Sequence, residues 1–242
     1  MSDPVRAVLF DLGNTLVAYY RARDFAPILR ESIDDICDFL AGRSAVEVER
    51  DAAFQHALEL NKEAPDNRVR PLAGRLAEIF SECELADDDL NAICNLFLRP
   101  IFRLGTLDPH ALPMLESLRR QGIRTAIVSN TPWGSPADSW MEELHRFGLT
   151  EAVDASVFCT EVGWRKPAKQ IFQHALSLLE VDARDCVFVG DDPRWDVEGA
   201  ERSGLRPILI DPQRLITNAR CPVIQSLEEL LPLVLPAGVD TR

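Results

Sequence analysis

Two acidic segments far apart in the sequence contain the residue types that hold a divalent cation. Asp11 follows an apolar run and begins the segment Asp-Leu-Gly-Asn-Thr, and Asp191 begins the segment Asp-Asp-Pro-Arg-Trp-Asp after another apolar run. Mg²⁺ prefers an octahedron of oxygen ligands and retains several waters, so one or two carboxylates and a carbonyl suffice in a protein site. We therefore expect Asp11, Asp191 and the backbone carbonyl of Gly13 to bind Mg²⁺.

Two segments between the acidic ones supply hydrogen-bond donors and a positive charge. Ser129 and Asn130 follow a third apolar run, and Lys166 precedes Pro167 at the expected start of a helix. A transferring phosphoryl group spreads negative charge over its oxygens, and donors and cations already in place stabilise that charge. We expect Ser129, Asn130 and Lys166 to bind the phosphate. Asp11 can then attack phosphorus and form an aspartyl-phosphate that water cleaves.

These residues lie at the ends of predicted strands of one sheet. Short apolar runs predict strands, whereas apolar residues at helical spacing and Pro or Gly at the boundaries predict the helices between them. The predicted strands are 5–10, 124–128, 156–159, 186–189 and 207–210. The predicted helices are 109–121, 136–147, 167–180, 195–203 and 226–235. Alternation of strand and helix is typical of a doubly wound parallel α/β sheet, in which ligands bind outside the carboxyl ends of the strands.

One long stretch interrupts this alternation. From 17 to 104 the apolar residues fall at helical spacing, and we find no convincing strand there. We expect residues 1–16 and 105–242 to form a Rossmann-like catalytic core and residues 17–104 to form an all-helical cap domain. An insertion after the first strand lies above the carboxyl ends of the sheet, so the cap is a candidate lid.

Composition restricts the partners. The chain has 242 residues and a formal net charge of −13, which repels nucleic acid and anionic lipid at long range, so we expect neither as a partner. The N-terminus lacks the basic and apolar regions of a signal peptide, and the apolar tail is broken by prolines and too short to span a bilayer. The six cysteines include no CxxC pair, which argues against a zinc site or a disulfide framework. We expect a cytoplasmic protein that acts on a small phosphorylated substrate.

Taken in order, the four segments resemble the motifs of the haloacid dehalogenase superfamily, over roughly residues 5–212. The resemblance implies a Mg²⁺-dependent hydrolase, most often a phosphatase, whose helical cap is inserted after the first strand. It implies that Asp11 is the nucleophile and a metal ligand, that Lys166 orients and neutralises the phosphate, and that Asp196 holds a metal-bound water. Asp192 could exchange roles with Asp191, and one of these two acids is also expected to cap the following helix.

The sequence departs from the family pattern at Gly13, where the family usually has a second Asp. That Asp protonates the leaving oxygen and activates water, and such groups contribute about 10²–10⁴-fold to rates. Glycine retains the carbonyl, so we expect a competent metal site with impaired proton transfer. Two alternatives remain open on this ground: a metal-free 2-haloacid dehalogenase in which Asp11 attacks carbon, and a binding or regulatory protein of low turnover.

Overall fold

A six-stranded, all-parallel sheet forms the centre of the protein, in the order β5-β4-β1-β6-β7-β8. The structure is a computed structural model that describes residues 4–43, 48–62 and 64–235. The strands are β1 (Ala7–Phe10), β4 (Arg124–Ser129), β5 (Ala155–Phe158), β6 (Cys186–Gly190), β7 (Arg206–Ile210) and β8 (Val223–Ile224). The five predicted strands and the doubly wound α/β class are confirmed. Two-residue β8 was not predicted, because it is too short to show a periodicity.

Helices cover both faces of this sheet. In β1, Val8 and Phe10 belong to one buried apolar cluster, whereas Ala7 and Leu9 belong to the other, as alternation along a strand requires. Residues of α5 pack in the first cluster, and residues of α8 and α9 in the second. The helices of the core are α5 (Ala111–Arg120), α6 (Ala137–Arg146), α7 (Cys159–Val162), α8 (Lys169–Leu179), α9 (Gly199–Arg202) and α10 (Leu231–Val234). Short 3₁₀ or π turns are η1 (Ala22–Asp24), η2 (Pro132–Gly134), η3 (Ala183–Asp185), η4 (Pro193–Glu198) and η5 (Leu227–Glu229).

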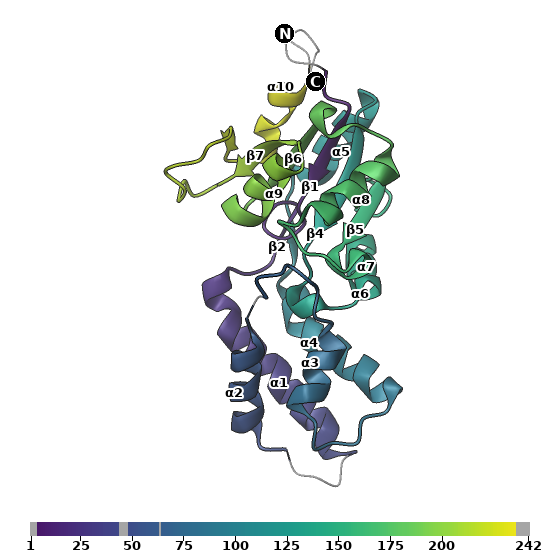
Figure 1. Cartoon of the computed structure of the whole chain (residues 1–242), viewed down its shortest axis with the longest axis vertical. Helices are drawn as coiled ribbons and strands as arrows, with labels where there is room; N and C mark the ends of the chain where they lie inside the picture. The colour runs from purple at the N-terminus through teal and green to yellow at the C-terminus, as the bar shows by residue number, and fades with distance from the viewer. Residues whose placement is uncertain (1–3, 44–47, 63, 236–242) are drawn as a thin grey trace.

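Four helices form the inserted cap at the other end of the molecule (Figure 1). They are α1 (Phe25–Ala41), α2 (Arg50–Leu60), α3 (Leu72–Ile79) and α4 (Asp87–Leu104). The chain enters and leaves the cap through β2 (Val17–Ala18) and β3 (Thr106–Leu107), which pair antiparallel. The predicted helical insertion is therefore confirmed, and the short strand pair is an addition to it. We retain 17–104 as the proposed cap domain.

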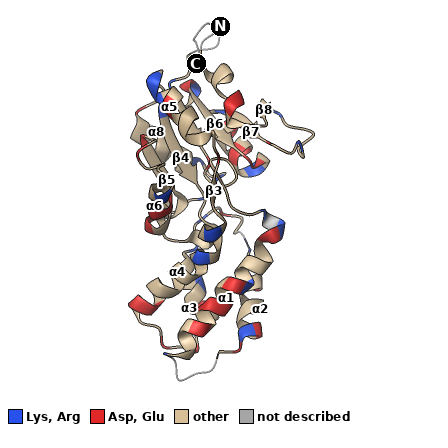
Figure 2. Ribbon diagram, turned by 180° about the vertical axis from the view of Figure 1, so that it is seen from behind, with Lys and Arg blue, Asp and Glu red and all other residues tan. Residues whose placement is uncertain are grey.

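The cap has an apolar interior of its own, centred on α1 and α4. One face of α1 is buried, and the Ser32 hydroxyl in it donates a hydrogen bond to the carbonyl of Phe97 on α4, at 2.9 Å. The opposite face contains acidic residues, which Figure 2 shows as red segments along α1. In the described part of the chain, no helix combines the length and apolar character that a membrane span needs.

The loop between α2 and α3 connects the cap to the core. The amide of Val69 donates to the carbonyl of Gly163, at 3.2 Å, and the indole N–H of Trp133 donates to Asn61 Oδ1, at 2.9 Å. Gly134 has φ +68° and lies so close to the carbonyl of Arg70 that a Cβ there would overlap it, so only glycine fits. The cap loop therefore lies against core loops that follow the strands.

We expect Phe97→Ala to lower the free energy of unfolding by about 3–5 kcal/mol, since it opens a cavity in the cap interior. Phe97 is fully buried and packs against Trp133, with ring centroids 5.1 Å apart. The measurement is urea denaturation followed by circular dichroism. Leu104→Ala is the control on the same helix, because Leu104 is 41% exposed and its loss should cost less than about 0.5 kcal/mol. Equal effects of the two substitutions would contradict this packing.

Candidate active site

Three strands deliver polar side chains to one edge of the sheet. Asp11 follows β1, Ser129 ends β4, and Asp191 follows β6, and these strands are neighbours in the sheet. The amide of Asp11 still donates to the carbonyl of Val189, at 2.8 Å, which fixes the first residue after β1 against β6. Because the strands are parallel, their carboxyl ends meet, and residues 180 positions apart become neighbours.

Lys166 lies at the centre of this edge. Its Nζ donates to Asp11 Oδ1 at 2.6 Å and to Asp196 Oδ1 at 2.7 Å. The ammonium is 2% exposed, so both ion pairs are shielded from water. Burial alone would lower the pKa of Lys166, but the negative charges of Asp11 and Asp196 outweigh burial and raise it. Lys166 is therefore a permanent cation that fixes the orientation of the Asp11 carboxylate.

Asn130 holds the backbone of Lys166 in place. Its Oδ1 accepts from the amide of Lys166 at 2.8 Å, and its Nδ2 donates to the carbonyl of Lys166 at 3.2 Å. The Asn130 side chain is thus used in positioning, so any phosphate contact is left to its backbone amide. The Ser129 hydroxyl is near the same loop and donates to the carbonyl of Asn130 at 3.3 Å.

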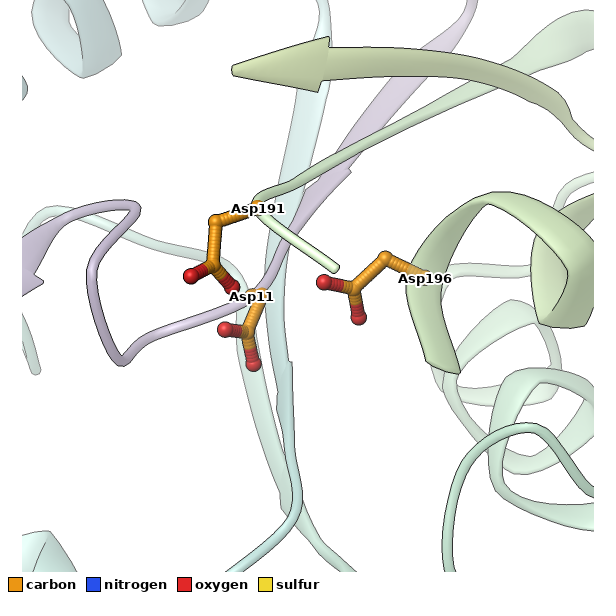
Figure 3. Close-up of side chains that lie close together, drawn as sticks. All are labelled: Asp11, Asp191 and Asp196. Atoms are coloured by element: carbon orange, nitrogen blue, oxygen red, sulfur yellow. The ribbon is translucent and has the colours of Figure 1, made fainter. Parts of the chain in front are cut away.

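A group of three carboxylates faces the same space (Figure 3). Oxygens of Asp11, Asp191 and Asp196 lie within 4.8 Å of one another, and the Asp191 carboxylate approaches that of Asp11 in the close-up. Burial, together with the charges of Asp11 and Asp196, raises the pKa of Asp191 to about 8. Burial raises the pKa of Asp196 as well, against the opposing effect of Lys166. One ammonium is therefore too little positive charge for three carboxylates, of which Asp11 and Asp196 are buried and Asp191 is half-buried.

This donor set fits a hard divalent cation. All three side chains offer oxygen, and the raised pKa of Asp191 reports a carboxylate without a compensating positive charge. Asp11 and Asp191 would hold the ion, and Gly13 lies in the wall of the same cavity. Gly190 contributes by its small size, since a Cβ there would overlap the Asp196 carboxylate.

The two adjacent acids after β6 have different environments. Asp192 caps η4: its Oδ1 accepts from the amides of Arg194 and Trp195, at 2.8 and 2.7 Å. The expectation that one acid caps the next helix is met by Asp192, whereas Asp191 belongs to the group of three carboxylates. Asp196 Oδ2 accepts from the amide of Asp192 at 3.0 Å, and its Oδ1 binds Lys166, so Asp196 connects the cap of η4 to the site.

A cavity of about 380 Å³ opens above these residues, and residues of the cap form part of its wall. Its walls include all of the residues that the sequence suggested: Asp11, Gly13, Ser129, Asn130, Lys166, Asp191, Asp192 and Asp196. Sequence reasoning missed the cap side of the wall, which is formed by Phe25, Asn61, Lys62, Arg75 and Ile101. No motif marks these residues, because they come from α1, α3, α4 and the α2–α3 loop and meet only when the cap folds.

Comparison with known proteins agrees with this fold. A model of haloacid dehalogenase-like hydrolases matches residues 5–204, so the chain belongs to that family and is a hydrolase. A ribulose-1,5-bisphosphate 5-phosphatase from Halopiger xanaduensis is 31% identical over 226 residues, which cover 85% of this chain and 84% of that protein.

Two solved structures show the same fold. A HAD phosphatase from Thermococcus onnurineus is 22% identical, with a TM-score of 0.68 over 95% of this chain and 98% of that one. A 2-haloacid dehalogenase from Pseudomonas syringae is 24% identical, with a TM-score of 0.68 over 95% of this chain and 97% of that one. Since a phosphatase and a dehalogenase match equally well, the fold alone does not choose between these reactions.

We expect Asp191→Asn to stabilise the metal-free protein at high pH. The pKa of Asp191 is about 8 in the folded state and about 3.8 in a model peptide. At a pH between these two values, the folded wild type therefore binds a proton at Asp191 more readily than the unfolded chain does. The contribution of Asp191 to stability is therefore present at pH 4 and is lost as the pH rises to 8. Asparagine does not titrate, so the variant escapes this loss.

The measurement is thermal unfolding in EDTA from pH 5 to pH 9. The melting temperature of the variant minus that of the wild type should increase up to pH 8 and then level off. The increase should be about 2–4 °C for each kcal/mol of unfolding free energy that the variant retains and the wild type loses. Asp192→Asn is the matched control, because asparagine also caps helices and Asp192 lies outside the three-carboxylate group. Parallel pH curves for wild type and Asp191→Asn would contradict the raised pKa.

Proposed function

We propose that the protein is a Mg²⁺-dependent phosphatase that hydrolyses a small phosphorylated metabolite through an aspartyl-phosphate at Asp11. One observation carries the proposal: the Asp11 carboxylate is held by Lys166 on one side and faces Asp191 on the other, in the wall of a cavity under the cap. A nucleophile in this position needs a cation to meet an anionic substrate, and the carboxylates provide the ligands for one.

The chain's own residues perform most of the first step. Lys166 binds Oδ1 of Asp11, which leaves the second oxygen, Oδ2, to form the bond to phosphorus. Ser129 and the backbone amide of Asn130 bind the oxygens of the phosphoryl group. When bound, Mg²⁺ supplies positive charge that offsets the repulsion between nucleophile and phosphate. Asp11, Asp191 and the carbonyl of Gly13 would hold it.

Water then completes the reaction by cleaving the acyl phosphate. The oxygen of water forms a bond to phosphorus, the bond from phosphorus to Asp11 Oδ2 breaks, and the two protons leave to the product phosphate and the solvent. Phosphoryl transfer proceeds through a loose transition state in which the attacking oxygen has formed little bond, so water needs little help from a base. This tolerance allows turnover without an Asp at position 13.

The size of the cavity favours a small substrate. The volume of about 380 Å³ lies near the lower end of the range for small-molecule sites. The ribulose-1,5-bisphosphate phosphatase among the relatives acts on a phosphorylated sugar, which favours a metabolite of this size here as well. The net charge of −13 continues to argue against nucleic acid and membrane partners.

The three-carboxylate group favours a phosphatase over a metal-free dehalogenase. A dehalogenase that attacks carbon needs one ionised Asp and no cation. Here Asp191 lies beside Asp11, where burial and repulsion make its ionisation costly unless a cation is present. Such an arrangement is useful for binding a metal and a disadvantage otherwise.

We expect Asp11→Asn to reduce hydrolysis of 4-nitrophenyl phosphate in Mg²⁺ by on the order of 10⁴-fold or more, since it removes the nucleophile. Addition of EDTA to the wild type should abolish the same activity. The measurement is release of nitrophenol and phosphate. Chloroacetate without metal is the parallel assay: release of chloride in EDTA would overturn the phosphatase in favour of the dehalogenase. Silence on all substrates would favour a binding protein.

A further inference from the structure

Position 13 leaves an open space beside the reacting atoms. Gly13 lies two residues after Asp11 in the cavity wall, and a Cβ there would meet only Tyr19 Cδ2, at an ordinary contact distance of 3.9 Å. Gly13 is also outside the left-handed region of φ. A Cβ would therefore fit at position 13, and glycine leaves this part of the cavity wall without a group that could give a proton to the leaving oxygen.

The residues next to this space are engaged elsewhere. The Asn14 side chain accepts from the amide of Tyr19 at 3.3 Å and donates to the carbonyl of Tyr20 at 3.2 Å, so it closes the loop. The Tyr19 hydroxyl donates to Glu143 Oε1 at 3.2 Å, and Glu143 is paired with Arg146 at 2.7 Å. Burial, followed by the charge of Glu143, raises the pKa of Tyr19, so its hydroxyl is a poor acid.

Few other acids remain among the described residues that line the cavity. Asp191 is a proposed ligand of the cation, Asp196 accepts from Lys166, and Asp192 caps η4. Arg75 and Arg165 also line the cavity, but they do not release protons, because guanidinium stays charged in proteins. Lys62 is an exposed residue on the cap side of the cavity. Its ammonium could donate a proton, so an experiment has to exclude it as the acid.

The missing donor determines how the bond to the leaving group must break. Asp11 Oδ2 forms a bond to phosphorus while the bond from phosphorus to the leaving oxygen breaks, and the electron pair goes to that oxygen. With no proton supplied, the oxygen leaves as an anion and takes a proton from water afterwards. The barrier then follows the basicity of the leaving oxygen, whereas an acid at position 13 would lower it for strongly basic alkoxides.

We propose that Gly13 restricts this enzyme to phosphates whose leaving oxygen is weakly basic, namely anomeric sugar phosphates and acyl phosphates, and disfavours phosphates of ordinary alcohols. This proposal rests on the phosphatase function proposed above. In an anomeric phosphate the ring oxygen withdraws electrons from the leaving oxygen, and in an acyl phosphate the carbonyl does so. Tyr20, Phe25 and Trp133 line the cavity and provide flat apolar surfaces for the leaving group.

The test is a series of substituted phenyl phosphates assayed in Mg²⁺ with wild type, Gly13→Asp and Gly13→Asn. The wild-type kcat/KM should fall steeply as the phenol becomes more basic. Gly13→Asp should flatten the slope and raise kcat/KM for the poorest leaving groups by about 10²–10⁴-fold, the contribution of a general acid. Gly13→Asn, which has the same shape and no acid, should keep the wild-type slope whatever its absolute rate.

Natural substrates provide the second arm. Glucose 1-phosphate and glucose 6-phosphate contain the same atoms but differ in leaving group and in shape, so the change in their kcat/KM ratio between the wild type and Gly13→Asp reports the leaving group. The wild type should prefer glucose 1-phosphate or acetyl phosphate to glucose 6-phosphate by about 10²-fold, and Gly13→Asp should reduce the preference. Preference for acetyl phosphate alone assigns the acyl class, and preference for glucose 1-phosphate assigns the anomeric class.

The outcomes separate this proposal from the phosphatase function. Hydrolysis with a flat wild-type slope would overturn the leaving-group restriction and leave the phosphatase intact. A slope that becomes steep only in Lys62→Met would overturn it too, because Lys62 would then be the acid. No hydrolysis of any phosphate by the wild type would overturn the phosphatase function, and this proposal with it. The wild-type slope decides the matter even if Gly13→Asp fails to fold.

Discussion

A single buried ammonium organises the active site. Lys166 binds Asp11 and Asp196 at 2.6 and 2.7 Å, out of contact with water. A buried ion pair is costly when one partner is missing, since the remaining charge is uncompensated, often by 3–5 kcal/mol. The loop that contains Lys166 must therefore lie where β1 and η4 bring their acids. Asn130 supports this geometry by binding both the amide and the carbonyl of Lys166.

The parallel sheet makes that constraint possible. Each of β1, β4 and β6 ends at the same edge of the sheet. The short polar segment after each strand therefore becomes part of one site because of the position of its strand. The insertion after β1 then determines access. Its two connecting strands, β2 and β3, pair with each other and fix the cap above the edge, and the α2–α3 loop closes against Gly163 and Trp133.

The core strands and the polar edge could be predicted from the sequence, because buried strands and the residues that follow them leave local patterns. The cap side of the cavity could not. Asn61 reaches it because the start of the α2–α3 loop lies against Trp133, and Arg75 reaches it from α3. Glu143 is a similar case: it lies among acids of α6 and looks solvent-exposed, yet Tyr19, 124 residues away, and Arg146 bury it. Such contacts depend on tertiary structure, and no pattern of neighbouring residues in the sequence indicates them. The two-residue strands β2, β3 and β8 escape for the simpler reason of length.

Charge balance relates Gly13 to the rest of the site. The three carboxylates of Asp11, Asp191 and Asp196 are matched by Lys166 and the proposed divalent cation, so the charges of this group sum to zero before an anionic phosphate enters. A fourth carboxylate at position 13 would make the site negative unless it remained protonated, and protonation is what an acid catalyst requires. Glycine avoids this conflict and leaves the metal carbonyl in place. Glycine at position 13 therefore impairs proton transfer and leaves phosphate binding unchanged. For this reason, its effect on the rate should depend on the basicity of the leaving oxygen.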